Sequence, residues 1–314
     1  MAAALVANPA PEPLPPPSAA ASSRPLTHPS TTGRDVRLAA RANAVRTPTS
    51  GLAPRHLQAN LVMLPARYAA DFRLLCARNP VPCPLLAESP APGRWDAVSS
   101  RLPIEVIDAA GGFDVRRDAP RYNVYEDGLL VESGAADVVG RWADDDHVAF
   151  LIGCSFSFEA ALAAAGLPPR HAARGRNVPM YRTAVPLCPA GVFTGATYVV
   201  SMRPYRAAEV ERVRAITRGY SDTHGEPIAW GWDALARLGI RDVDDPQWGD
   251  APLTEGGRPL GELYGSDDEV PVFWGCGVTP QEAVMRAGIQ GTVMAHAPGY
   301  MLLLDCTNED VVSK

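Results

Sequence analysis

The sequence predicts a two-lobed α/β fold, with mixed sheets covered by helices and strand–turn–helix elements at a cleft between the lobes. Three observations predict this class. Apolar runs of strand length alternate with helical segments along most of the chain, which is typical of α/β proteins. The run 147–153 is apolar without polar alternation, as in a strand covered on both faces. With 314 residues, the chain is long enough for one large or two modest domains.

The N-terminal stretch 1–33 is rich in proline, alanine and serine. Such a composition buries too little apolar surface to form a core. We therefore expect a disordered tail over 1–33 and a single catalytic unit over 34–314. Within that unit, the expected lobes are 34–118 together with 226–314, and 119–225.

In the first half of the chain we expect helices over about 35–45, 56–65 and 68–78, the last one closed by Asn79-Pro80. The dipeptide Asp127-Gly128 between two alternating runs predicts a β-hairpin.

In the second half, strand 147–153 precedes a helix over 157–165 that ends at Gly166, with prolines just beyond it. Further strands are expected over 195–204, 226–231, 270–277 and 299–305, and further helices over 207–218, 233–239 and 279–288. The last of these helices begins with Thr279-Pro280-Gln281-Glu282, which predicts a capping box with proline at the first position.

Charge and cysteine content exclude several classes of function. A formal net charge of −6 gives no general attraction for nucleic acid or anionic membranes, and no apolar stretch reaches the ~18–20 residues of a membrane helix. The six cysteines form no CxxC pair and no zinc spacing. We expect reduced thiols, no signal peptide, a cytoplasmic location and no cofactor. A divalent metal and a homo-oligomeric state stay open.

Two stretches, 153–166 and 275–288, share a pattern. Both open with Gly-Cys, close with Ala-Gly and carry a hydroxyl residue in fifth place. Each indicates a buried strand, a tight turn and a helix start, and free N–H groups at helix starts bind anions. No phosphate-binding glycine motif is present, and "GCSFS" does not match the nucleophile elbow of hydrolases. If both turns lie at one cleft, they form a receptor for a carboxylate.

Each residue of these turns also has a structural explanation. Ser155, Ser157 and Thr279 can be helix N-caps, and Glu159 in a first turn interacts favourably with the helix dipole. Cys154 and Cys276 can be small core residues.

Two arginines stand near apolar segments, Arg203 at the end of a strand and Arg182 in "NVPMYRT". Each is either a salt-bridge partner or a bidentate clamp for a substrate carboxylate. The polar residues Asn177, Tyr181, His224 and His296 also lie at strand ends or turns, where chemistry is often placed. In contrast, the polar loops around His28, His147 and His171 predict solvated side chains.

Several longer motifs identify a family resemblance: "GLAPRHLQANLVMLP" (51–65), "NPVPCPLL" (79–86), "FLIGCSFSFE" (150–159), "NVPMYRT" (177–183), "SMRP" (201–204), "PVFWGCGVTPQ" (271–281) and "HAPGYMLLLD" (296–305). In this order the chain resembles the D-glutamate cyclase family over about 45–305. It departs from the family pattern at Arg55, where glycine is usual, and at Tyr300, where histidine is usual. The resemblance implies a two-lobed α/β fold and a lyase that eliminates water. For vertebrate-type members it implies closure of D-glutamate to 5-oxo-D-proline.

We therefore expect a hydro-lyase acting on a small carboxylate or amino acid. Such a reaction needs an acid and a base, donors for an oxyanion and a clamp for a carboxylate. The acid/base candidates are Glu159, His224 and His296, with Cys154 as a further catalytic candidate. Oxyanion donors are expected among the N–H groups of 154–157 and 277–279. The substrate-binding candidates are Ser155, Ser157, Asn177, Tyr181, Arg182, Arg203, Cys276 and Thr279. Dehydration of a hydroxy acid, and non-catalytic binding of a small carboxylate, are the alternatives.

Overall fold

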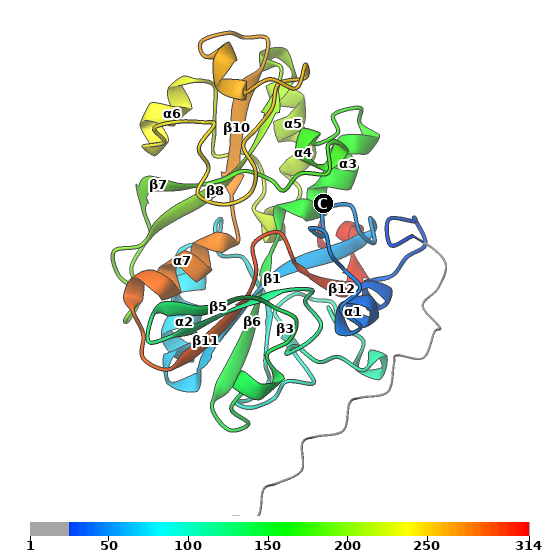
Figure 1. Ribbon diagram of the computed structural model, residues 1–314, viewed down its shortest axis with the longest axis vertical. Coiled ribbons are helices and arrows are strands. Elements are labelled where there is room, and N and C mark those ends of the chain that lie inside the picture. Colours follow the sequence, from blue (N-terminus) through cyan, green and yellow to red (C-terminus); the bar gives the residue numbers. More distant parts are fainter. Residues whose placement is uncertain (1–24, 314) are drawn as a thin grey trace, which may run out of the picture.

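The structure, a computed structural model, describes residues 25–313 and contains two β-sheets, which occupy the lower and upper halves of Figure 1. The larger sheet has eight strands in the order β3-β2-β6-β1-β11-β4-β5, with β12 also paired to β1. The smaller sheet has the order β7-β8-β10-β9. All strand pairings between described residues are antiparallel. The two sheets and their helices confirm the predicted α/β class.

The bounds of the elements are as follows. The larger sheet consists of β1 (His56–Pro65), β2 (Leu85–Glu88), β3 (Ser99–Ser100), β4 (Tyr122–Glu126), β5 (Leu129–Ala135), β6 (His147–Gly153), β11 (Thr292–His296) and β12 (Leu302–Thr307). The smaller sheet consists of β7 (Met180–Pro186), β8 (Thr197–Tyr205), β9 (Ala229–Trp230) and β10 (Val270–Gly275). The α-helices are α1 (Gly33–Arg41), α2 (Ala69–Arg78), α3 (Glu159–Ala164), α4 (Arg170–Ala173), α5 (Val210–Thr217), α6 (Asp233–Leu238) and α7 (Val278–Ala287).

The larger sheet lies between two apolar layers. On β1, Leu57 and Leu61 pack into one buried cluster, whereas Val62 and Leu64 pack into another. β6 divides its side chains between the same two clusters. Because both faces are buried, neither strand needs the polar alternation of a surface strand.

The helix predicted over 56–65 is wrong, because this segment is β1, the central strand of the larger sheet. Nine of its ten residues are buried. A continuous apolar run has no period that separates a buried strand from a buried helix, and its leucine, methionine and alanine favour a helix locally. Pairing with β6, β11 and β12 decides the conformation.

Other predicted elements lie close to their expected places. The hairpin is confirmed, since β4 and β5 are joined by Asp127 and Gly128, whose φ angles of +50° and +82° suit a tight hairpin turn. The capping box at Thr279 is wrong, because Gly277 is the N-cap of α7 and the Thr279 hydroxyl bonds to the backbone of Val199. β11 was not predicted.

Within residues 25–313, no helix is long and apolar enough to cross a membrane.

The sheets divide the chain at residues other than the predicted lobe boundaries. Strands of the larger sheet come from 56–153 and 292–307, and those of the smaller sheet from 180–275. The hairpin β4–β5 and β6 therefore join the N-terminal strands, whereas β9 and β10 join the smaller sheet. The physical reason is long-range pairing of β6 with β1 and of β10 with β8, which composition does not reveal.

The predicted tail is described only in part, because residues 1–24 lie outside the described residues. Residues 25–33 contact the fold. Leu26 packs against a buried cluster that includes Val36 and Leu303, and its carbonyl accepts the Ala53 N–H at 2.9 Å. Thr31 is buried as well. The prediction of disorder up to residue 33 is therefore wrong over 25–33.

Candidate active site

The two Gly-Cys turns meet in space. Gly153-Cys154 follows β6, and Gly275-Cys276 follows β10. The two cysteines belong to one buried apolar cluster that also contains Val199 of β8. The Cys276 N–H donates to the Val199 carbonyl at 3.1 Å. The two similar segments thus lie side by side.

His224 lies beside both turns. The segment around His224 packs closely against both glycines. A Cβ atom added at Gly153 would lie 2.1 Å from the Asp222 carbonyl oxygen, and one added at Gly275 would lie 3.4 Å from His224 Nδ1. The backbone of His224 has a φ of +87°. Its Nδ1 lies 2.8 Å from the Val81 carbonyl oxygen. Its other ring nitrogen, Nε2, is buried and has no hydrogen-bond partner among the described residues. Burial lowers the pKa of His224 to about 4, so the ring is neutral at pH 7.

A buried charged network lies next to the Cys154 turn. Arg203 of β8 is at its centre and has a side chain with no exposed surface. Its Nε donates to Glu159 Oε1 at 3.0 Å, and its two terminal nitrogens reach Ser155 Oγ at 3.1 Å and Ser201 Oγ at 3.3 Å. We call this set, with two further contacts of Glu159, the Glu159–Arg203 network; its members are Ser50, Ser155, Glu159, His171, Ser201 and Arg203.

Glu159 is the anion of the network. Ser50 Oγ donates to its Oε2 at 2.8 Å, and His171 Nε2 lies 3.2 Å from its Oε1. Burial raises the pKa of Glu159, but the positive charges of His171 and Arg203 more than offset burial and lower the pKa to about 2. Glu159 is therefore ionised at neutral pH and has no proton to donate. It balances the charge of Arg203 and lies beside His171.

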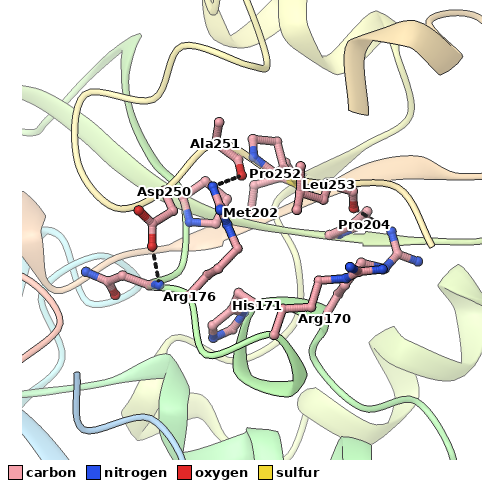
Figure 2. A pocket seen from close by; sticks show the side chains of 12 residues that line it. Arg170, His171, Arg176, Met202, Pro204, Asp250, Ala251, Pro252 and Leu253 are labelled. Carbon is pink, nitrogen blue, oxygen red and sulfur yellow. Dashed lines mark hydrogen bonds between the residues drawn. The ribbon is translucent and has the colours of Figure 1, made fainter. Parts of the chain in front are cut away.

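His171 connects the network to a small pocket, which is shown in Figure 2. Its imidazole stacks on Phe156, with the ring centroids 6.0 Å apart. The pocket is also lined by Arg176, Asn177 and the loop 250–253. Its free volume of about 20 Å³ is room for about one water molecule.

Three buried polar atoms at this pocket have no hydrogen-bond partner among the described residues. They are His171 Nε2, Arg176 Nε and Asn177 Oδ1, which belong to residues that line the pocket. The contact of His171 with Glu159 is close, but it does not have the geometry of a hydrogen bond. A buried polar atom left unpaired costs about 1–3 kcal/mol, so such atoms are usually satisfied by a ligand, water or a moving group. Their concentration here marks the pocket as a candidate binding site.

The two predicted carboxylate clamps have partners within the chain. Arg203 is bound by Glu159. Arg182 forms a two-pronged ion pair with Glu282, with N–O distances of 2.7 and 3.0 Å, and lies over the Trp248 ring. Neither guanidinium is free to hold a substrate carboxylate in this conformation.

Three other predicted residues have structural contacts. His296 is fully buried, its Nδ1 accepts the Leu61 N–H at 3.0 Å, and burial lowers its pKa to about 4. The Tyr181 hydroxyl donates to the Val243 carbonyl at 2.6 Å. Thr279 joins α7 to β8 as described above. These side chains hold elements together.

Three of the predicted oxyanion donors, the N–H groups of Phe156, Ser157 and Thr279, have partners within the chain. The chain after Cys154 forms a 3₁₀ turn (Ser155–Phe158), in which the Cys154 thiol accepts the Phe156 N–H and the Cys154 carbonyl accepts the Ser157 N–H. The Thr279 N–H donates to the Cys276 carbonyl. Burial raises the pKa of both thiols, that of Cys276 to about 11, so neither is a thiolate at neutral pH. Ser157 Oγ is buried without a hydrogen-bond partner among the described residues.

Sequence reasoning found Ser155, Glu159 and Arg203 but missed three members of the network: Ser50, His171 and Ser201. The prediction that His171 is solvated is wrong, because only 8% of it is exposed. No local pattern identifies it, since its burial comes from packing of α4 against Phe156 and the loop 250–253. Among residues 25–313, no group of three histidine, cysteine or acidic side chains is arranged to hold a metal ion.

The fold and the site define an α/β protein in which a buried, charge-paired network adjoins a small pocket. The sequence profile of the D-glutamate cyclase family matches residues 148–305, about half of the chain. This chain belongs to the D-glutamate cyclase family.

Its relatives carry provisional hydro-lyase names. A protein of Schizosaccharomyces pombe is 44% identical over 260 residues, covering 83% of this chain and 79% of the relative. A protein of Bordetella pertussis is 46% identical and covers 88% and 90%, and one of Rubrobacter xylanophilus is 47% identical and covers 82% and 89%. The solved structure of a nitrogen repressor-like protein from Methanococcus jannaschii covers 90% of this chain and 98% of its own, at 8% identity and a TM-score of 0.36. That similarity carries no structural argument.

Proposed function

We propose that this protein is a lyase that removes water from a small carboxylate bound at the His171 pocket, with closure of D-glutamate to 5-oxo-D-proline as its reaction. Family membership and the hydro-lyase names of the relatives support the reaction class. The observation that carries the site is the contact between ionised Glu159 and His171, whose ring lines the pocket.

A carboxylate next to a histidine can fix the orientation of the ring. Glu159 suits this role because Arg203 and Ser50 hold it in place and keep it charged. His171 is then the group that gives and takes protons at the substrate. Glu159, which acts through His171, is a positioning residue.

The pocket also offers groups that recognise a carboxylate. Arg176 and Asn177 line it together, and Arg176 donates from a terminal nitrogen to the Ala251 carbonyl at 3.1 Å, as Figure 2 shows. The unpaired Nε of Arg176 supplies a further donor. A planar guanidinium is the side chain best shaped to bind a carboxylate in two places.

In the proposed reaction, the α-amino nitrogen of glutamate forms a bond to its own side-chain carboxyl carbon. The α-ammonium group loses two protons in all, and one oxygen of the side-chain carboxylate takes up two protons and leaves as water. Holding the two ends of one molecule together provides most of the acceleration, since well-oriented intramolecular reactions reach effective molarities of ~10⁵–10⁸ M. His171 would relay a proton to the departing oxygen.

A molecule as large as glutamate does not fit into about 20 Å³. Binding therefore requires the loop 250–253 to move away from α4. Four hydrogen bonds close the pocket. They join Arg170 to the Leu253 carbonyl at 2.9 Å, Arg176 to the Ala251 carbonyl, the Asn177 N–H to the Asp250 carboxylate at 2.7 Å, and the Asp250 N–H to the Asn177 carbonyl at 3.3 Å. A carboxylate that binds Arg176 replaces one of them.

The direct test is incubation of the purified protein with D-glutamate, L-glutamate and several hydroxy acids, with mass spectrometry of the products. We expect loss of water from D-glutamate and formation of 5-oxoproline. Loss of water from a hydroxy acid alone would replace cyclisation with ordinary dehydration. Saturable thermal stabilisation by a carboxylate without any product would instead identify a non-catalytic binder.

The site assignment is tested by His171→Asn, with the exposed His28→Asn as the matched control. We expect the turnover of His171→Asn to fall by ~10²–10⁴-fold, as for loss of a general acid–base group, while His28→Asn keeps normal turnover. Normal turnover of a folded His171→Asn protein would remove His171 from the mechanism.

A further inference from the structure

A second cavity, which we call the Arg101 cavity, is separate from the His171 pocket, since no residue lines both. Its walls come from α2, the segment 80–85, Arg101, Ser221 and Asp222. Its volume of about 540 Å³ is within the range of small-molecule sites. Unlike the His171 pocket, this cavity has room for a ligand without movement of the chain.

One part of the cavity carries an excess of positive charge. Arg73 Nε donates to Glu88 Oε2 at 2.5 Å, and a terminal nitrogen of Arg101 donates to Glu88 Oε1. Two guanidinium groups thus share a single buried carboxylate. Their other nitrogens have no hydrogen-bond partner among residues 25–313. Because a guanidinium suits a carboxylate, this part of the cavity can bind an anionic group.

Another part of the cavity carries an unpaired carboxylate. Asp222 is half-buried, and its side chain has no hydrogen bond or ion pair within residues 25–313. Burial raises the pKa of Asp222, and no neighbouring positive charge offsets the loss of water. A cationic group of a ligand would supply that missing charge.

Strand β6 shows that these two parts are well separated. Glu88 faces Phe150 in the pairing of β2 with β6, and the Arg73 guanidinium lies 5.8 Å from the centre of the Phe150 ring. The Asp222 carbonyl instead packs against Gly153, at the other end of β6. At about 3.3 Å per residue, Phe150 and Gly153 are about 10 Å apart along the strand. The positive and negative groups therefore lie at two ends of the cavity.

The wall between the two ends is apolar. Leu85 faces Ile152, and the Pro84 carbonyl accepts the Gly153 N–H at 2.9 Å, so both lining residues follow β6 from one end to the other. Cys76 and Cys83 also line the cavity. Burial raises the pKa of both thiols, that of Cys76 to about 12, so they are uncharged at neutral pH.

We propose that the Arg101 cavity binds an elongated zwitterion, with its carboxylate at Arg73 and Arg101, its ammonium group at Asp222 and its methylene chain against Leu85. Such a ligand matches each end with an opposite charge and the middle with an apolar chain. A dicarboxylate would place a negative charge beside Asp222, and a diamine would place a positive charge beside the arginines. Both fit the cavity less well than a zwitterion.

The first experiment titrates the full chain with 6-aminohexanoate by isothermal calorimetry. We expect saturable binding. Hexanoate lacks the ammonium group and hexylamine lacks the carboxylate, so each should bind about tenfold more weakly, as for loss of one charged hydrogen bond. Absence of saturable binding of 6-aminohexanoate, or equal affinity for all three compounds, would overturn the proposal.

The second experiment repeats the titration with variants of the two ends. Asp222→Asn should bind 6-aminohexanoate about tenfold more weakly and hexanoate no less tightly than the wild type does. Arg101→Gln should weaken the binding of both compounds. The matched control is Arg94→Gln, because Arg94 is 52% exposed and pairs with Asp96, as Arg101 is 50% exposed and pairs with Glu88, but does not line the cavity.

Unchanged affinity in Asp222→Asn, or in a folded Arg101→Gln protein, would remove the cavity as the binding site. Asp222→Asn breaks no contact within residues 25–313, so it keeps the test available if Arg101→Gln unfolds. His171→Asn should bind 6-aminohexanoate like the wild type. A loss of binding there would place the ligand in the His171 pocket instead. Since the readout is binding and not turnover, the result is independent of the proposed lyase reaction.

Discussion

Two arginine–glutamate ion pairs of this protein join the same residue types, but one pair is buried and the other is partly exposed. Arg203 and Glu159 have side chains that are 0% and 8% exposed, and Arg203 also lies near the rings of Phe158 and Trp274. Arg182 is 44% exposed and pairs with Glu282 on the surface. Both arginines were predicted to clamp a substrate carboxylate, and each instead binds a glutamate of its own chain.

Burial changes how much the same kind of ion pair contributes to the free energy of unfolding. An exposed ion pair contributes about 0–1 kcal/mol, because water and salt screen it. In a buried pair, each ion depends on the other, since removing one leaves an uncompensated charge in a poorly polarisable interior. The buried pair can therefore hold His171 in a fixed place, whereas the exposed pair has no comparable effect on its surroundings.

The largest expected effect is that of Glu159→Gln. This change removes the counter-charge of fully buried Arg203, and loss of one partner of a buried pair typically costs 3–5 kcal/mol. We expect a loss of about 3–5 kcal/mol in the free energy of unfolding, measured by urea denaturation. Glu282→Gln is the matched control and should cost about 1 kcal/mol or less. Equal small losses in both variants would mean that Glu159 acts merely as a residue of the first helical turn.

The same pair should make stability depend on pH. The folded-state pKa of Glu159 is about 2, below its ordinary value of 4.5, so the unfolded chain binds more protons between these values. The contribution of Glu159 is therefore fully present above pH 4.5 and is lost as the pH falls through about 2. We expect the stability difference between wild type and Glu159→Gln to shrink over this window. A difference that stays constant down to the acid limit of folding would contradict the lowered pKa.

Arg203→Lys should have a smaller but clear effect. Lysine keeps the charge but loses the planar fork that reaches Glu159, Ser155 and Ser201 together. We expect a loss of about 2 kcal/mol, as for a hydrogen bond to a charged group, and reduced turnover because His171 loses its fixed partner. Unchanged turnover in a destabilised variant would restrict Arg203 to a role in folding.

The smallest expected effect is that of Arg182→Lys. Its pair with Glu282 is partly exposed, and lysine can keep one of the two contacts. We expect a change of less than about 1 kcal/mol that declines further in high salt, and normal substrate affinity. A large rise in KM would show that Arg182 leaves Glu282 and binds substrate, which would revive the predicted clamp.

Part of the site could be predicted from sequence because polar residues at strand ends are visible as a pattern. The two Gly-Cys turns were found in this way, and they do lie together. Their chemistry was not predictable, since the Cys154 thiol, three of the turn N–H groups and the Thr279 hydroxyl have partners within the chain. His171 could not be found, because a histidine in an arginine-rich polar stretch has no local signal of burial.

The sequence by itself determined the α/β class, the hairpin at Asp127-Gly128, the strands 147–153 and 270–275, and membership in the D-glutamate cyclase family. These follow from turn chemistry, from uninterrupted apolar runs and from long ordered motifs, all of which are local properties of the chain. The tertiary structure alone decided that 56–65 is the central strand, which glutamate neutralises each arginine, and that His171 is buried beside Glu159. The physical reason is that strand pairing, burial and charge compensation join residues far apart in the sequence, such as Ser50 with Glu159 and Arg182 with Glu282.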